Sequence, residues 1–358
     1  MNIRELAANH AQWLNGAEDH HGVVISCRAR LARNLSTMPF APKATVDDQE
    51  RVIEQVLTAA QRGHLMHSAS FFRMDTMRDN ERRLLVERHL VSPALAESKG
   101  QRGLLFGRDE SLSIMINEED HLRLQAILPG LQAEHAWTAV NALDDEFGAS
   151  VAYAHSDRWG FLTACPTNVG TGLRLSILIH LPALVLTEDM DRMTRSLTEM
   201  AFTVRGFYGE GTHSVGNLFQ VSNQSTLGVE ENKIVEKLTA ITQQIIACEK
   251  DAQDALLKEA RAQVEDKVWR AYGLLSNARI LSSQEFMNLL SAVRLGYSLG
   301  LLKQINSAFM NRLMIVTQPS HLQMENGEEI ASEERDVYRA ERVRSQFATL
   351  ASEEGKQS

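Results

Sequence analysis

The sequence of 358 residues has few cysteines and no long apolar run. Its three cysteines, Cys27, Cys165 and Cys248, form no CxxC pair, which argues against a disulfide framework and against a cysteine metal cluster. No stretch approaches the roughly 20 apolar residues of a membrane span, and the N-terminus lacks the pattern of a secretory signal. We therefore expect a cytoplasmic protein with reduced thiols and no membrane partner.

Positive charge is also scarce. With 37 Lys and Arg against 46 Asp and Glu, the formal net charge is −9, which argues against direct nucleic-acid binding because that requires a positive field. The histidines show no metal-ligand spacing such as HExxH, so we predict no metal site of the protein's own. The common nucleotide signatures, GxxxxGK[ST], the protein-kinase glycine loop with HRD, and the Rossmann fingerprint, are missing too.

What is present suffices for a large folded core, since 44% of the residues are hydrophobic and 23% are charged. Hydrophobic periodicity predicts helices at 46–62, 80–88 and 133–146, and strands at 21–30, 103–106, 111–117, 151–155, 160–163, 174–180, 202–208 and 219–222. From residue 230 onward the pattern is almost entirely helical. We predict an α+β fold, an antiparallel sheet flanked by helices, followed by an all-helical C-terminal domain. The predicted divisions are a helical segment 1–21, a catalytic domain 22–250 and a helical domain 251–358.

Five arginines lie near the ends of predicted strands: Arg28, Arg30, Arg123, Arg174 and Arg205. The planar, permanently charged guanidinium can hold phosphate oxygens with two hydrogen bonds at once. Any one of these residues alone would more often form a surface ion pair. The five together, in glycine-punctuated or acid-flanked segments, indicate a phosphate site, although spacing alone cannot bring them to one place.

An acidic run, residues 117–120 (NEED), directly follows the apolar stretch SLSIMI. If the substrate were a guanidinium, with a pKa above about 12, a carboxylate would have to orient it and accept its proton. Glu119 and Glu210 are the candidates for that pair. The alternative is a solvated turn or a helix N-terminus, where acidic residues favour the helix dipole.

Cys165 precedes a tight polar turn that contains Pro166, Thr167 and Asn168. A thiolate beside arginines could contact a cationic group, whereas the alternative is a buried and inert thiol. The glycines of RGFYGEG, residues 205–211, would let backbone N–H groups approach a phosphate.

Read in order, NEEDHLR, CPTN-x-GT-x-x-R and VRG-x-x-GE closely resemble the motifs of the phosphagen kinases, the ATP:guanidino phosphotransferases. The resemblance covers about Val23 to Gly228. It implies a glutamine-synthetase-like catalytic fold and ATP as cofactor, with Mg²⁺ entering together with ATP. It also implies that Glu119 and Glu210 are catalytic and that, with Cys165, they contact the substrate guanidinium. The nucleotide site implied by the resemblance comprises Ser26, Cys27, Arg28, Ala29, Arg30, His89, Arg123, Arg174, Leu175, Ser176, Ile177, Leu178, Arg205, Gly206, Phe207, Tyr208 and Gly209.

Two departures from the small-molecule phosphagen kinases indicate one branch of that family. Only about 20 residues precede the first strand motif, where those enzymes have a substrate-covering helical domain. Tyr208 and His213 stand where those enzymes carry an arginine and a second carboxylate, so Glu210 is the expected partner of Glu119. An open site suits an arginine presented on a protein, and these features resemble the bacterial protein-arginine kinases of the McsB type.

The C-terminal segment RDVYRA matches the RDxxRA motif of the same branch. The resemblance implies an allosteric phosphoarginine pocket formed by Arg335, Asp336, Arg339 and Ala340, whereas the residues alone also fit a solvated helix face. The implied partners are protein substrates with exposed arginine, among them a heat-shock repressor, a Clp-type ATPase and protease, and a zinc-containing activator protein. By the same resemblance we expect a homodimer or a larger assembly.

Two other functions stay open from the sequence. One is a small-molecule guanidino (arginine) kinase. The other is a non-catalytic phosphoarginine-binding adaptor, which the C-terminal motif and Cys27 would allow because related sequences more often have serine or threonine at that position. The presence of Glu119, Glu210 and the five arginines argues against an adaptor.

Overall fold

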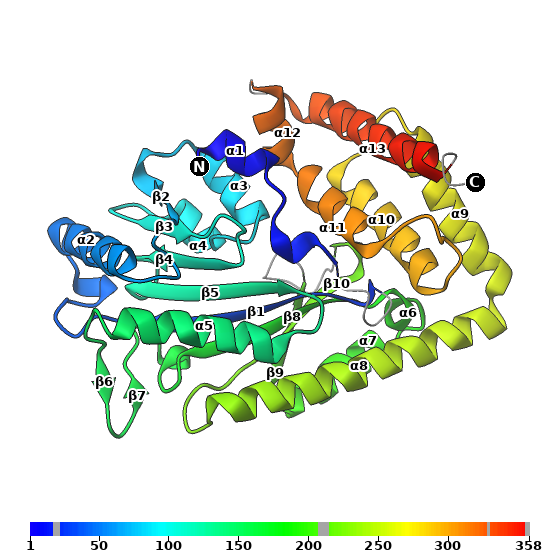
Figure 1. The fold of residues 1–358 in the computed structure, drawn as a ribbon. Coiled ribbons are helices and arrows are strands. Elements are labelled where there is room, and N and C mark those ends of the chain that lie inside the picture. Colours follow the sequence, from blue (N-terminus) through cyan, green and yellow to red (C-terminus); the bar gives the residue numbers. More distant parts are fainter. Residues whose placement is uncertain (17–21, 207–214, 328–329, 355–358) are drawn as a thin grey trace.

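The centre of the fold is an antiparallel sheet of eight strands in the order β2-β3-β4-β5-β1-β8-β10-β9. The computed structural model describes residues 1–16, 22–206, 215–327 and 330–354 (Figure 1). The strands are β1 (Val24–Arg33), β2 (Ser70–Arg73), β3 (Gly103–Phe106), β4 (Leu112–Ile116), β5 (Leu122–Pro129), β8 (Leu173–His180), β9 (Phe202–Gly206) and β10 (Leu218–Asn223). A separate hairpin pairs β6 (His155–Ser156) with β7 (Gly160–Phe161). The predicted α+β class with an antiparallel sheet is confirmed.

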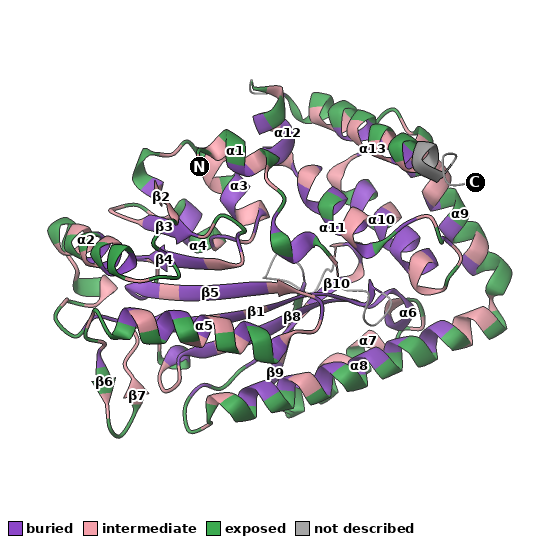
Figure 2. Cartoon of the chain, viewed as in Figure 1, coloured by how far each residue is buried: buried purple, intermediate pink, exposed green. Residues whose placement is uncertain are grey.

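The alternation of side chains along β1 gives the sheet two different faces. Cys27, Ala29 and Leu31 are fully buried in the main hydrophobic core, whereas Arg28 and Arg30 point to the opposite face. The core side is covered by α2 (Val46–Arg62), α5 (Ala133–Gly148) and α8 (Glu231–Glu259). Figure 2 shows the central strands buried beneath these helices.

The opposite side of the sheet is partly covered by helices from both ends of the chain (Figure 1). The N-terminal ones are α1 (Ile3–Ala8), α3 (Asp79–Glu87) and α4 (Pro93–Glu97), and the C-terminal ones are α9 (Arg261–Asn277), α10 (Ser283–Ser298), α11 (Ser307–Val316), α12 (Pro319–Asn326) and α13 (Ser332–Glu354). A second hydrophobic core joins the C-terminal helices to Ile25, Ile127 and Leu178 of the sheet. The helices α6 (Pro182–Leu186) and α7 (Met190–Glu199) connect β8 to β9. Within the described ranges, no helix combines the length and apolar character that crossing a bilayer requires.

Two features differ from the sequence-based expectations. The strand predicted at 151–155 is wrong in extent, because Tyr153 forms only an isolated bridge with Leu35 and the ladder begins at His155. The division predicted at residue 250 falls inside α8, which is continuous from Glu231 to Glu259. The break in helical structure comes later, at Ala260, which separates α8 from α9.

Candidate active site

A cleft of about 830 Å³ lies on the face of the sheet opposite the main core. Strands β1, β5, β8, β9 and β10 line it, together with residues between 86 and 102 and residues of the segment 165–168. Gln318, which precedes α12, contributes from the C-terminal helices. The cleft has the size of a pocket for a nucleotide-sized ligand.

All five predicted arginines line this cleft: Arg28, Arg30, Arg123, Arg174 and Arg205. Strand pairing brings them together, because β1 lies between β5 and β8 and Arg30 stands directly opposite Arg174 in the register. Sequence spacing could not show this convergence, since these arginines come from four strands distributed over 178 residue numbers, from Arg28 to Arg205, counted inclusively.

The arginines form a positive field that acidic residues compensate only in part. Burial and, to a smaller extent, the neighbouring Arg123 and Arg174 together lower the pKa of Arg28 to about 10. Burial, and then the charges of Arg28, Arg123 and Arg174, lower the pKa of Arg30, and Glu118 partly offsets this effect. The positive charges of these guanidinium groups repel one another. A ligand with several negative charges would reduce this repulsion and stabilise the arrangement.

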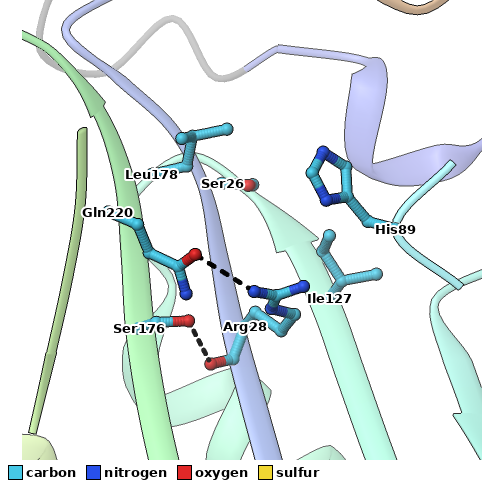
Figure 3. Close-up of a pocket in the computed structure, with 7 residues that line it drawn as sticks. All are labelled: Ser26, Arg28, His89, Ile127, Ser176, Leu178 and Gln220. Carbon is cyan, nitrogen blue, oxygen red and sulfur yellow. Dashed lines mark hydrogen bonds between the residues drawn. The ribbon is translucent and has the colours of Figure 1, made fainter. Parts of the chain in front are cut away.

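Two polar residues of β10 orient arginines in the floor. Gln220 Oε1 accepts a hydrogen bond of 3.2 Å from Arg28 Nη2, and Ser222 Oγ accepts one of 3.3 Å from Arg174 Nη2. Figure 3 shows Arg28 reaching Gln220, with His89 on the other side of the pocket. Sequence reasoning missed both residues, because only the pairing of β10 with β8 places them beside the arginines.

A small, less charged pocket shares Arg28, His89 and Gln220 with the cleft, and we call it the narrow end of the cleft. Its lining is Ser26, Arg28, His89, Ile127, Ser176, Leu178 and Gln220 (Figure 3). The His89 ring packs edge-on against Trp13 with centroids 5.3 Å apart. Burial lowers the pKa of His89 to about 3, with smaller effects from Arg28 and Arg30, so the imidazole is neutral at physiological pH. This end suits an uncharged planar group better than a phosphate.

The residues of the contiguous runs expected around the nucleotide differ in where their side chains lie. The side chains of Cys27, Ala29, Leu175 and Ile177 are fully buried in the main core, on the face away from the cleft. Cys27 Sγ accepts a hydrogen bond from the backbone N–H of Gln132, and burial raises the pKa of this thiol to about 12. Because side chains alternate along a strand, only every second residue of each run can line the cleft with its side chain.

Part of the expected site falls outside the described residues. These residues are Phe207, Tyr208, Gly209, Glu210 and His213. Gly206, the last residue of β9, is buried, and Arg205 before it is exposed in the cleft.

The acidic run 117–120 divides into residues with different environments. Glu118 forms an ion pair of 2.5 Å with Arg123 and accepts a hydrogen bond from Ser92. Glu119 is exposed in the cleft, where its Oε2 accepts a hydrogen bond of 3.3 Å from Asn168 Nδ2. Glu119 is therefore the carboxylate of this run that is available to a cationic ligand.

Cys165 lines the same end of the cleft and is half-buried. Its Sγ lies 3.0 Å from Thr167 Oγ1, and its backbone carbonyl accepts a hydrogen bond of 2.7 Å from Thr163. Both Cys165 and Glu119 act electrostatically on Arg174, against the effect of burial on its pKa. The cleft thus places a site for a cation directly beside a site for a polyanion.

Comparisons with known proteins agree with this arrangement. The profile of the ATP:guanido phosphotransferase C-terminal catalytic domain matches residues 50–252, and that of the protein-arginine kinase McsB C-terminal domain matches residues 261–358. A protein-arginine kinase of Halothermothrix orenii is 43% identical over 348 residues, covering 97% of this chain and 99% of that protein. One of Moorella thermoacetica is 45% identical over 342 residues, covering 95% and 98%. This chain belongs to the protein-arginine kinase family.

Solved structures support the fold of this protein-arginine kinase family member. A lombricine kinase has a TM-score of 0.59 at 22% identity, with 70% of this chain and 71% of that chain covered. A substrate-free duplicated taurocyamine kinase of Schistosoma mansoni has a TM-score of 0.58 at 22% identity, with 80% and 42% covered. The catalytic fold predicted from the motifs is confirmed, and the chain is an enzyme of the ATP:guanido phosphotransferase class.

The four residues predicted to bind phosphoarginine in this family member lie on α13, and they differ in availability. Arg335 is half-buried and donates to the carbonyl of Ile330, and Asp336 is also half-buried. Arg339 is 1% exposed, and it donates to the carbonyls of Thr317 and Leu281 and to Asp336. Ala340 is fully buried. The guanidinium of Arg335 is therefore more accessible to a ligand than that of Arg339. The hydrogen bonds of Arg339 hold α13 against the neighbouring helices.

Among the residues that the structure describes, no three His, Cys, Asp or Glu side chains form a group able to hold a metal ion. The charged lining of the cleft consists largely of guanidinium groups, which fit phosphate oxygens and not a cation.

Proposed function

We propose that this protein transfers the γ-phosphate of ATP to the guanidinium group of arginine side chains in proteins. The observation that carries the proposal is the junction of opposite charges in one cleft, where the arginine cluster meets Glu119 and Cys165. The arginine cluster is complementary to a polyphosphate, and Glu119 with Cys165 is complementary to a guanidinium. Transfer between bound ligands requires this adjacency.

The proposed nucleotide site uses the arginines for the phosphates and the narrow end for the adenosine. Ser26, His89 and Leu178 would surround the base and ribose, where the lining is mostly uncharged. The arginines would neutralise charge on the transferring group, as in other phosphoryl transfers. Mg²⁺ would enter on the phosphates and supply further neutralisation there.

The proposed acceptor site uses Glu119 to orient the guanidinium and to take its proton as the N–P bond forms. Asn168 holds that carboxylate, and Cys165 lies at the same end of the cleft. We propose Glu210, outside the described residues, as the second carboxylate. Two acceptors around a planar cation would fix the nitrogen in line with the γ-phosphate.

A protein substrate is supported by the relatives, which are named protein-arginine kinases and cover nearly the whole chain. We further propose that Arg335, Asp336, Arg339 and Ala340 bind phosphoarginine. A heat-shock repressor among the substrates, a Clp-type protease as reader, a zinc-containing activator and a homodimer or larger assembly belong to the same proposal.

The test uses the full-length protein with labelled ATP, Mg²⁺ and casein. Mass spectrometry under conditions that spare acid-labile N–P bonds should find phosphoarginine in casein, and Glu119→Gln should abolish it. Label on free L-arginine alone would identify a small-molecule kinase. Phosphoarginine binding without any transfer, even with an activator present, would identify an adaptor and contradict the proposal.

A further inference from the structure

Asp120 stands next to Glu119 but lies in the opposite environment. The Glu119 side chain is exposed in the cleft, whereas Asp120 is 3% exposed and does not line the cleft. A carboxylate is rarely buried unless several donors satisfy it. Asp120 has no part in the proposed transfer, so its burial needs another explanation.

Within the part of the chain that the structure describes, the hydrogen bonds to Asp120 come from N–H groups, which can only donate. Its Oδ1 accepts from the backbone N–H of Ala164 at 2.6 Å and from Asn34 Nδ2 at 2.7 Å. Its Oδ2 lies 3.5 Å from Asn168 Nδ2. The orientation of the Asn34 amide is fixed, because its Oδ1 accepts from the N–H of His121 and its Nδ2 also donates to the carbonyl of Leu162.

These donors lie on separate segments that meet at the acceptor site. Asn34 follows the end of β1, and Ala164 immediately precedes Cys165 in the loop between β7 and β8. The Asn168 amide is shared, because Nδ2 also donates to Glu119 Oε2. Asp120 therefore joins the turn that carries Glu119 to the loop that carries Cys165.

The charge on Asp120 matters to this junction. Burial raises the pKa of Asp120, and the hydrogen bonds from Ala164, Asn34 and Asn168 oppose the rise. A neutral amide in its place would turn an NH₂ group toward a donor, since both oxygens face donors. The junction thus depends on a carboxylate at this position and not only on its shape.

We propose that Asp120 is a positioning residue that sets the placement of the Glu119 carboxylate relative to the Cys165 thiol, the two groups beside the guanidinium. The inference rests on the proposed function, because it assigns Asp120 a part in holding the acceptor site. Misplacement of reacting groups by about 1 Å can lower turnover about 100-fold. The arginine cluster has no hydrogen bond to Asp120, so ATP binding should be unaffected.

The test compares Asp120→Asn with its parent in a Cys248→Ser background of the full chain. Cys248 is exposed and Cys27 is fully buried, so a thiol reagent then reports on Cys165. Three quantities are measured: kcat on casein, KM for ATP, and the rate of Cys165 labelling. We expect kcat to fall about 100-fold with KM for ATP changed less than about threefold. Labelling should become roughly tenfold faster, because a hydrogen bond to a charged group is lost from the loop.

Glu249→Gln is the matched control. Glu249 is another fully buried carboxylate that accepts two backbone N–H hydrogen bonds, from Ala183 and Leu184, but it lies on α8 away from the cleft. This variant should change the free energy of unfolding while leaving kcat and the labelling rate as in the parent. Equal effects of Asp120→Asn and Glu249→Gln on kcat and labelling would reduce Asp120 to a general structural residue and overturn the inference.

Asn168→Ala tests the positioning role of Asp120 if Asp120→Asn does not fold. It removes the amide shared by Glu119 and Asp120, and we expect lower kcat and faster labelling. A folded variant with parental kcat and labelling overturns the inference. If the parent makes no phosphoarginine but Asp120→Asn still labels faster, the proposed function fails while the positioning of the loop by Asp120 stands.

Discussion

Glu87, the last residue of α3, caps the first turn of α12 through Ser320 and His321. Its carboxylate accepts from the N–H groups of Ser320 at 2.8 Å and His321 at 3.1 Å, and from the His321 ring at Nδ1. Arg88 Nη1 lies 3.3 Å from Nε2 of the same ring. Because Glu87 accepts and Arg88 donates, these contacts require a neutral imidazole protonated at Nδ1. Burial, the main effect on the pKa of His321, lowers it and favours that form.

This contact joins the C-terminal helices to the wall of the cleft. His89 follows directly in sequence and lines the narrow end, and Gln318 lines the cleft from the α12 side. Glu87→Gln should therefore raise KM for ATP several-fold and lower the free energy of unfolding by about 1–3 kcal/mol, since buried donors lose a charged acceptor. ATP titration of activity and urea unfolding measure the two effects. Glu54→Gln, at an exposed position of α2, is the control, and a KM equal to the parent's in Glu87→Gln would exclude the link.

The buried pair of Arg33 and Asp144 supports the main core beneath the site. Arg33 donates to both Asp144 oxygens and to the carbonyls of Ala32 and Thr171, and its guanidinium lies 3.4 Å from the centroid of the Phe161 ring. Asp144→Ala leaves a buried charge unpaired and should lower the free energy of unfolding by about 3–5 kcal/mol.

Urea unfolding compares this variant with Arg51→Ala. The Arg51 side chain is 67% exposed and, among the described residues, lies in an ion pair with Asp48 at 4.0 Å. The exposed variant should show no measurable change. Similar unfolding midpoints for the two variants would mean that the buried pair contributes no more than a surface one.

The helices and the motif order could be read from the sequence, but the site could not be assembled from it. Helix α2 has the predicted bounds because Thr45 and Asp48 form a capping box before a strongly periodic stretch. The positions of Gln220 and Ser222 depend on strand register, which no local pattern fixes. Asp120 was not singled out, because an acidic residue within a polar run gives no local sign of burial. The burial of the Cys27 side chain could not be read from the motif either, since a contiguous motif does not show the alternation of strand side chains.

Glu249 predicts a pH dependence of stability. Burial raises the pKa of this carboxyl to about 7, while hydrogen bonds from Gln253 and the backbone of Ala183 and Leu184 partly oppose the rise. Between its unfolded pKa near 4.5 and about 7, the folded protein binds a proton that the unfolded chain has released. The stabilisation is complete below about 4.5 and is lost as pH rises through about 7, by roughly 3 kcal/mol in total.

Urea unfolding of the parent and Glu249→Gln at pH 5 and pH 8 isolates this effect, because the glutamine does not titrate. The difference in unfolding free energy between parent and variant should shift against the parent at pH 8. A difference that is the same at both pH values would show that Glu249 titrates alike in the folded and unfolded states.

The C-terminal motif predicts different outcomes for its two arginines. Arg335 makes one hydrogen bond to a carbonyl and is half-buried, so Arg335→Ala should weaken the response of activity to added phosphoarginine without reducing stability measurably. Arg339 joins α13 to Thr317 and Leu281 while almost fully buried. Arg339→Ala should therefore also lower the free energy of unfolding, by about 3 kcal/mol, because it leaves buried carbonyls without donors.

Activity with and without phosphoarginine, ATP binding and urea unfolding separate the two roles. A parental response in Arg335→Ala would remove this residue from the pocket, and parental stability in Arg339→Ala would show that its buried hydrogen bonds contribute little.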